Sequence, residues 1–165
     1  MIQLSLDSIN ARSYYYVMLS PKGNYIFETE RGIHYSISFE EENPFGGCNT
    51  YQFIIDKIDN VHSPHDPQVE RTILVIVDEF FRSHMNVLLY ICDTSDGREA
   101  KRNRLFLNWF DKNAEPNRFT IRTANTTVEG EGFYTAIIVE NRNPLLEAVI
   151  ADFEMTAEAL TTGKP

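Results

Sequence analysis

The sequence predicts a single α+β domain with a mostly antiparallel, mixed β-sheet, in the order ββββ-α-β-α-ββ-α. Aromatic and β-branched runs separated by turn residues fill the first third, which is typical of strands. Two later segments repeat apolar residues at helical spacing. Strands and helices do not alternate regularly, which argues against a doubly wound fold. We therefore divide residues 1–165 into an N-terminal β-meander (13–56), a central α-β-α unit (67–112) and a β-hairpin with a C-terminal helix (117–161).

Four strands are expected in the meander, each rich in aromatic and β-branched residues: Ser13–Leu19, Tyr25–Thr29, Ile33–Phe39 and Thr50–Ile55. Pro- and Gly-containing turns separate the first three. Residues 40–47 are acidic and contain glycine, and we expect a solvated loop there.

A buried helix should follow this meander. Asp66 and Pro67 supply an N-cap and a first-turn proline. Apolar residues then recur at helical spacing as far as Phe81, and the helix is expected to end near residues 82–84.

The most informative stretch is residues 86–110. The continuous apolar run Val87–Cys92 predicts a strand covered on both faces. Turn-forming residues 93–97 follow, and Asp96 with Glu99 resembles a capping box that starts a helix reaching Phe110.

Two arginines of that helix fall on the face expected to be buried. At about 100° per residue, Arg98 and Arg102 share a sector of roughly 60° with Leu105 and Trp109. One interpretation is structural, with the arginines paired to Asp93 or another carboxylate, or extended past Trp109. The other is an anion pocket at the helix N-terminus. The residues that would form this pocket are Asp93, Thr94, Asp96, Arg98, Arg102 and Arg104.

The last third predicts a hairpin of residues 118–123 and 133–139, joined by a polar loop at 124–132. A final helix should start at Asn143-Pro144. Its apolar stripe, which includes Val149 and Phe153, indicates packing on its own sheet. A dimer interface or a docking face for a partner is the alternative, in which Val149 and Phe153 would be the interaction residues.

Composition excludes several functional classes. The net charge of −9 and the pI near 4.9 argue against general nucleic-acid binding. No apolar run approaches about 18 residues and nothing resembles a signal peptide, so we expect no membrane span and a cytoplasmic location. The common phosphate-loop, dinucleotide, zinc-protease and serine-hydrolase motifs are missing, so no cofactor is expected. His62 and His65 lack a further ligand nearby, so no metal site is expected either.

A family resemblance is carried by residues 91–110, which are ICDTSDGREAKRNRLFLNWF. This run and its flanks, from about Tyr14 to about Val139, resemble an uncharacterised bacterial family known only as a domain of unknown function. The resemblance implies a small, soluble bacterial protein and brings no activity with it.

Two functional hypotheses follow from the residues. The preferred one is a non-enzymatic protein-binding or regulatory module with a protein partner or a homodimer, because the surface is acidic and the last helix is strongly patterned. The alternative is a phosphate- or nucleotide-binding enzyme or sensor that uses the anion pocket at residues 93–104.

Overall fold

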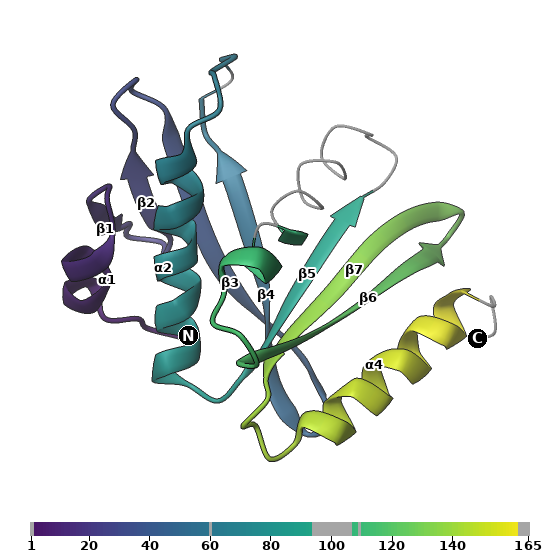
Figure 1. Ribbon diagram of the computed structural model, residues 1–165. Coiled ribbons are helices and arrows are strands. Elements are labelled where there is room, and N and C mark those ends of the chain that lie inside the picture. The colour runs from purple at the N-terminus through teal and green to yellow at the C-terminus, as the bar shows by residue number, and fades with distance from the viewer. Residues whose placement is uncertain (1, 60, 94–106, 109, 162–165) are drawn as a thin grey trace. The chain divides into compact units, whose positions relative to one another are not determined.

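The fold class predicted from the sequence is confirmed. The computed structural model describes residues 2–59, 61–93, 107–108 and 110–161, and it shows an α+β fold with one seven-stranded sheet in the order β1-β2-β3-β4-β5-β7-β6 (Figure 1). β4 and β5 run parallel, whereas β1–β2, β2–β3, β5–β7 and β6–β7 are antiparallel. The chain divides into two compact units. The first comprises Met1–Glu40 and Phe53–Met85, and the second comprises Glu41–Gln52 and Asn86–Pro165.

The helices and strands have the following bounds. Those that begin before residue 86 are α1 (Leu6–Arg12), β1 (Val17–Leu19), β2 (Tyr25–Glu28), β3 (His34–Phe45), β4 (Cys48–Lys57) and α2 (Pro67–Ser83). Those that follow are β5 (Val87–Asp93), β6 (Phe119–Val128), β7 (Glu131–Glu140) and α4 (Leu146–Thr161). Residues 107–108 and 110–113 are also helical.

The first unit is built around α2. Asp66 caps this helix as expected, because its side chain accepts a hydrogen bond from the Gln68 amide at 2.9 Å. The apolar face of α2 packs on the strands, where the Phe80 ring stacks on Phe39 with ring centroids 4.9 Å apart. Fully buried aromatic side chains, which include Phe27 and Phe81, fill the space between helix and strands.

The structure corrects the prediction of a strand from Ser13, because β1 is only three residues long and a short helix precedes it. Ser5 caps α1 by accepting from the Ser8 amide at 3.2 Å. Arg12 then joins α1 to α2 through ion pairs with Asp78 at 2.5 Å and Glu79 at 2.8 Å. Because Ile9 is the only buried residue in this helix, the sequence has no apolar stripe that would reveal it.

Two predicted loops are strands in the structure. β3 continues to Phe45, so that the expected loop at 40–47 is reduced to the turn Gly46-Gly47. The expected loop at 124–132 is likewise the continuation of β6 and β7 around Glu129-Gly130. Both segments carry polar side chains that face solvent, which hides their strand character in a hydropathy pattern.

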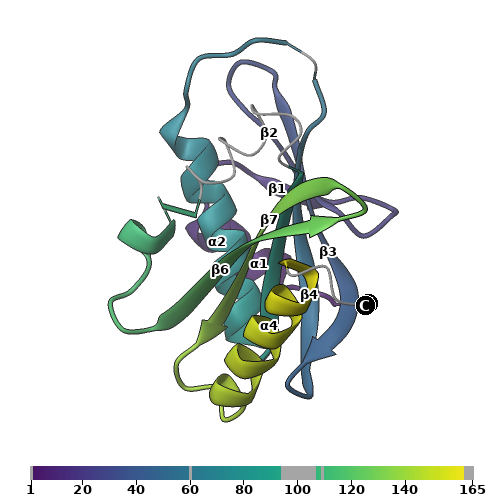
Figure 2. The same cartoon turned by 90° about the vertical axis from the view of Figure 1, so that its right-hand side faces the viewer.

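In the second unit, α4 packs against β6 and β7 (Figure 2). Its core is formed by Cys48, Val87, Leu89, Ile137, Val139, Val149 and Phe153. The turn after β3 is fastened to this helix, because the Gly46 amide donates to the Asp152 carboxylate at 2.8 Å. Gly46 has φ +57°, and a Cβ there would lie 2.5 Å from Ala148 C and Val149 N. Only glycine allows this close approach.

We predict that Gly46→Ala destabilises the protein by about 2–4 kcal/mol, since left-handed strain is added to a backbone clash. Gly47→Ala is the matched control, because Gly47 also has a positive φ (+77°) but has no atom within 4 Å of the added Cβ. The control should lose about 1 kcal/mol. Urea unfolding of both variants measures the difference, and equal losses would contradict the close packing of this turn on α4.

Candidate functional site

The outer edge of β6 is the candidate functional site. β6 is the last strand of the sheet and pairs with β7 over ten residues, from Phe119↔Glu140 to Val128↔Glu131. The turn Glu129-Gly130 has two residues, with φ 52° and 81°, so the pair that flanks it, Val128 and Glu131, is a hydrogen-bonded pair. The backbone N–H and C=O groups of the even-numbered residues of β6 therefore bond to β7. The backbone groups of the odd-numbered residues point outward: Phe119, Ile121, Thr123, Asn125 and Thr127.

Part of this edge is open. Among the described residues, no hydrogen-bond partner is found for the backbone groups of Thr123 and Thr127, and both residues are exposed. The Ile121 carbonyl accepts a hydrogen bond from Arg122 Nη1 at 3.1 Å, and that arginine side chain is 47% exposed. The open part of the edge therefore consists of the backbone groups of Thr123 and Thr127, and beside them the Ile121 carbonyl is covered by the exposed Arg122 side chain.

The composition of β6 does not protect this edge. Natural edge strands are usually short, or carry lysine, proline or a bulge that prevents another strand from pairing. Residues 119–128 contain no Pro, Gly, Lys, Asp or Glu, and Arg122 is their only charged residue. Four threonines, with Phe119 and Ile121, give the strand high β-propensity. The edge is suited to accept a further strand.

The opposite end of the sheet is closed by contrast. β1 is three residues long, and Asn10 from α1 occupies the outward groups of its first residue: the Val17 amide donates to Asn10 Oδ1 at 2.7 Å, and Asn10 Nδ2 donates to the Val17 carbonyl at 2.9 Å. Just before the strand, the Tyr15 amide donates to Thr72 Oγ1 at 3.4 Å, and Ser13 Oγ donates to the Tyr15 carbonyl at 2.8 Å. At Tyr15 and Val17, side chains thus take the places that a further strand would need.

Tyr15 also joins this closed edge to α2. Its hydroxyl donates to Asp66 Oδ2 at 2.5 Å, and its ring stacks on Phe27 with centroids 5.8 Å apart. Burial, together with the Asp66 carboxylate, raises the pKa of Tyr15 to about 12.

Most of the residues predicted to form an anion pocket lie outside the described residues. The backbone of Asp93 ends β5, where it pairs with Phe133 of β7. The others, for which the structure gives no position, are Thr94, Asp96, Arg98, Arg102 and Arg104.

The predicted interaction residues Val149 and Phe153 are in the interior of the second unit, with 0% and 4% exposure. Phe153 packs edge-on against Phe45. These side chains attach α4 to its own sheet, as the apolar stripe indicated, and in this structure they contribute to the core of the second unit rather than to its surface. A partner would have to contact other residues.

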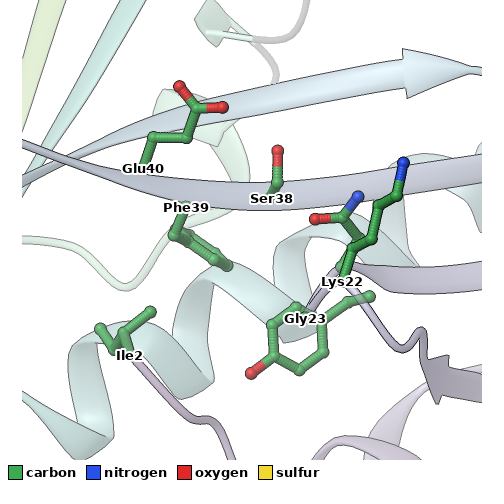
Figure 3. Close-up of a pocket in the computed structure, with 8 residues that line it drawn as sticks. Ile2, Lys22, Gly23, Ser38, Phe39 and Glu40 are labelled. Carbon is green, nitrogen blue, oxygen red and sulfur yellow. The ribbon is translucent and has the colours of Figure 1, made fainter.

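The first unit contains a cavity of about 220 Å³ near the start of β2. Its polar and aromatic groups do not converge: Ser38 and Glu40 project from one side of β3, whereas Phe39 projects toward Ile2 on the other (Figure 3). The buried Tyr25 hydroxyl accepts from the Leu4 amide at 2.8 Å, so it anchors the N-terminal segment. We assign no function to this cavity.

Among the ionisable side chains, His34 and Cys48 have hydrogen-bond partners in the structure. Asp59 Oδ2 lies 2.9 Å from His34 Nδ1 and accepts from the His34 amide at 2.5 Å, and these N–H groups lower the pKa of Asp59. No nucleophile has a contact with His34 in the part of the chain that the structure covers. Cys48 is buried in the second unit, where it accepts from Asn143 Nδ2 at 3.5 Å.

Among the described residues, no group of three or more His, Cys, Asp or Glu side chains is placed to hold a metal ion. None of the helices in the described ranges is long and apolar enough to cross a membrane.

Comparison with known proteins identifies one family. The model of a family of unknown function (DUF6169) matches residues 65–155, which is more than half of the chain and includes all of β6. No curated protein and no solved structure matches.

We predict that the hydrogen bond from Tyr15 makes stability fall at alkaline pH. Because the folded pKa lies above the unfolded value near 10, the contribution of Tyr15 is complete below pH 10 and is lost as the pH rises toward 12. Tyr15→Phe should therefore be less stable than wild type at pH 8 but should lose less stability between pH 9 and 11. Urea unfolding at these pH values measures this, with Tyr16→Phe, at a 71% exposed position, as the control. Equal losses in wild type and Tyr15→Phe would refute the assignment.

Proposed function

The chain belongs to this family of unknown function, and we propose that it is a non-enzymatic protein-binding module that adds a strand of another protein to the open edge of β6. The single observation that supports this proposal is the contrast between the two ends of the sheet. Asn10 and its neighbours close the β1 edge, whereas β6 is ten residues long and exposes backbone groups at Thr123 and Thr127. We place this activity in the cytoplasm of a bacterium, in keeping with the sequence.

Strand addition explains how such an edge would bind. An extended segment that pairs with β6 forms main-chain hydrogen bonds, which provide affinity, and its alternating side chains meet the two faces of the sheet, which provides specificity. The Ile121 carbonyl is released for pairing when Arg122 swings away, and the exposure of that side chain allows it to move.

We predict that Thr123→Pro abolishes partner binding. Proline removes the outward N–H, and its ring obstructs an approaching strand, while the bonds between β6 and β7 remain because Thr123 faces away from β7. Thr123→Val is the matched control, since it keeps the N–H and the β-propensity.

Affinity capture from the source cell, with quantification by mass spectrometry, checks this prediction. Wild type and Thr123→Val should retain the same partner, and Thr123→Pro should retain at least about tenfold less at a melting temperature within a few degrees of wild type. Equal retention by Thr123→Pro would contradict the proposal.

A second candidate function comes from the sequence of the matched stretch. This function would use a phosphate or nucleotide pocket at a helix N-terminus, formed by Asp93, Thr94, Asp96, Arg98, Arg102 and Arg104. A thermal-shift titration with inorganic phosphate and ATP separates the two functions. The phosphate hypothesis requires a saturable rise in melting temperature that is lost in Arg102→Ala, whereas our preferred proposal predicts no rise in either protein.

A further inference from the structure

We infer that the strand received by β6 is a basic segment of the partner, carrying lysine or arginine on the side chains that face α4. This inference rests on the proposed function and adds the chemistry of the partner to it. Two observations support it: the position of α4 beside the open edge, and the charge of the side of α4 that borders this edge.

The contacts of α4 orient the helix. On one flank, Ala148 lies against Gly46 and Asp152 accepts from the Gly46 amide at 2.8 Å, so this flank faces the β3–β4 turn. On another flank, Glu154 Oε1 lies 3.9 Å from Arg122 Nε of β6. That second flank therefore borders the last strand of the sheet.

The flank beside β6 is acidic. Glu147, Glu154 and Glu158 are spaced by seven and four residues, which places them in one stripe about 40° wide at 100° per residue. All three are exposed, and the Glu154 side chain is 62% exposed. Arg122 contacts Glu154, and no cation contacts Glu147 among the residues that the structure describes.

A strand added to β6 would bring every second side chain to the face that α4 covers, because side chains alternate along a strand. Those side chains would stand beside the acidic stripe. Lysine and arginine have the reach and the charge to meet these carboxylates, whereas aspartate or glutamate would be repelled.

A second copy of the chain fits this edge poorly. Antiparallel pairing of β6 with β6 of another copy would place both α4 helices on the same face of the joined sheet. Their acidic stripes would then face each other in two molecules that each carry a net charge of −9. Like charges at this position disfavour the homodimer and favour a basic partner.

The inference can be tested with two fluorescently labelled peptides, acetyl-(Lys-Val-Lys-Thr)₂-amide and acetyl-(Glu-Val-Glu-Thr)₂-amide. Anisotropy titrations at low salt should show that wild type binds the lysine peptide at least about tenfold more tightly than the glutamate peptide. The double variant E147K/E154K should reverse this order. The control E40K/E41K, which changes net charge equally on β3, should keep the wild-type preference. Thr123→Pro should weaken binding of the lysine peptide at least about tenfold.

Each other outcome is decisive. Binding that depends on Thr123 but does not distinguish the two peptides would overturn the basic partner and leave the proposed function standing. Binding of the lysine peptide that Thr123→Pro does not change would show that the acidic stripe acts without the edge, which would overturn both. Failure of the lysine peptide to bind at millimolar concentration would overturn the inference, because the capture experiment tests the edge separately. Sedimentation velocity could also show that wild type is a dimer and that Thr123→Pro is a monomer. That result would mean that a second copy of the chain, and not a basic partner, pairs with β6.

Discussion

The hydrogen-bonding capacity of a sheet's outermost backbone is the constraint on which this structure depends. Where a strand pairs on both sides its amide and carbonyl groups are taken, whereas the outward groups of the two end strands must find other partners or face water. In the first unit, α1 supplies such a partner. The side-chain amide of Asn10 accepts a hydrogen bond from the Val17 N–H and donates one to the Val17 carbonyl. The helix that carries Asn10 is held to α2 by Arg12, Asp78 and Glu79. Closure of the β1 edge at Val17 thus depends in part on the ion pairs that join α1 to α2.

In the second unit, the helix α4 stabilises the core, and the β6 edge is left open at Thr123 and Thr127. The turn at Gly46 and the carboxylate of Asp152 hold α4 against the sheet, with Val149 and Phe153 buried beneath it. None of these contacts uses the outward backbone groups of Thr123 and Thr127. Because the core needs Val149 and Phe153 for its own stability, the proposed interaction surface lies beside α4 rather than under it.

Much of the architecture was predictable because its signals are local. The cap at Asp66 and the proline after it locate the start of α2, and the apolar run from Val87 identifies β5 as a strand inside the sheet. Strand extensions were missed where polar side chains dominate, as in β6 with its four threonines. The seven-residue helix α1 buries only Ile9, which is too little to produce a periodic pattern.

The candidate site was not predictable from the sequence for a physical reason. Whether the amide of Thr123 points toward β7 or away from it depends on the register that the Glu129-Gly130 turn imposes, and a shift of one residue would reverse it. The acidic stripe on α4 is visible in the sequence as Glu147, Glu154 and Glu158. Its position beside the sheet edge emerges only from the contacts of α4 with Arg122 and Gly46.

Residue-resolved amide hydrogen exchange of the free protein measures the outward N–H groups at both ends of the sheet without altering them. We predict strong protection at Val17, whose amide is bound by Asn10, and protection at Arg122 and Ala124, which face β7. Thr123 and Thr127 should exchange at least about a hundredfold faster than their neighbours on β6. Protection of Thr123 and Thr127 equal to that of Arg122 and Ala124 would mean that the β6 edge is already occupied, and would contradict the account.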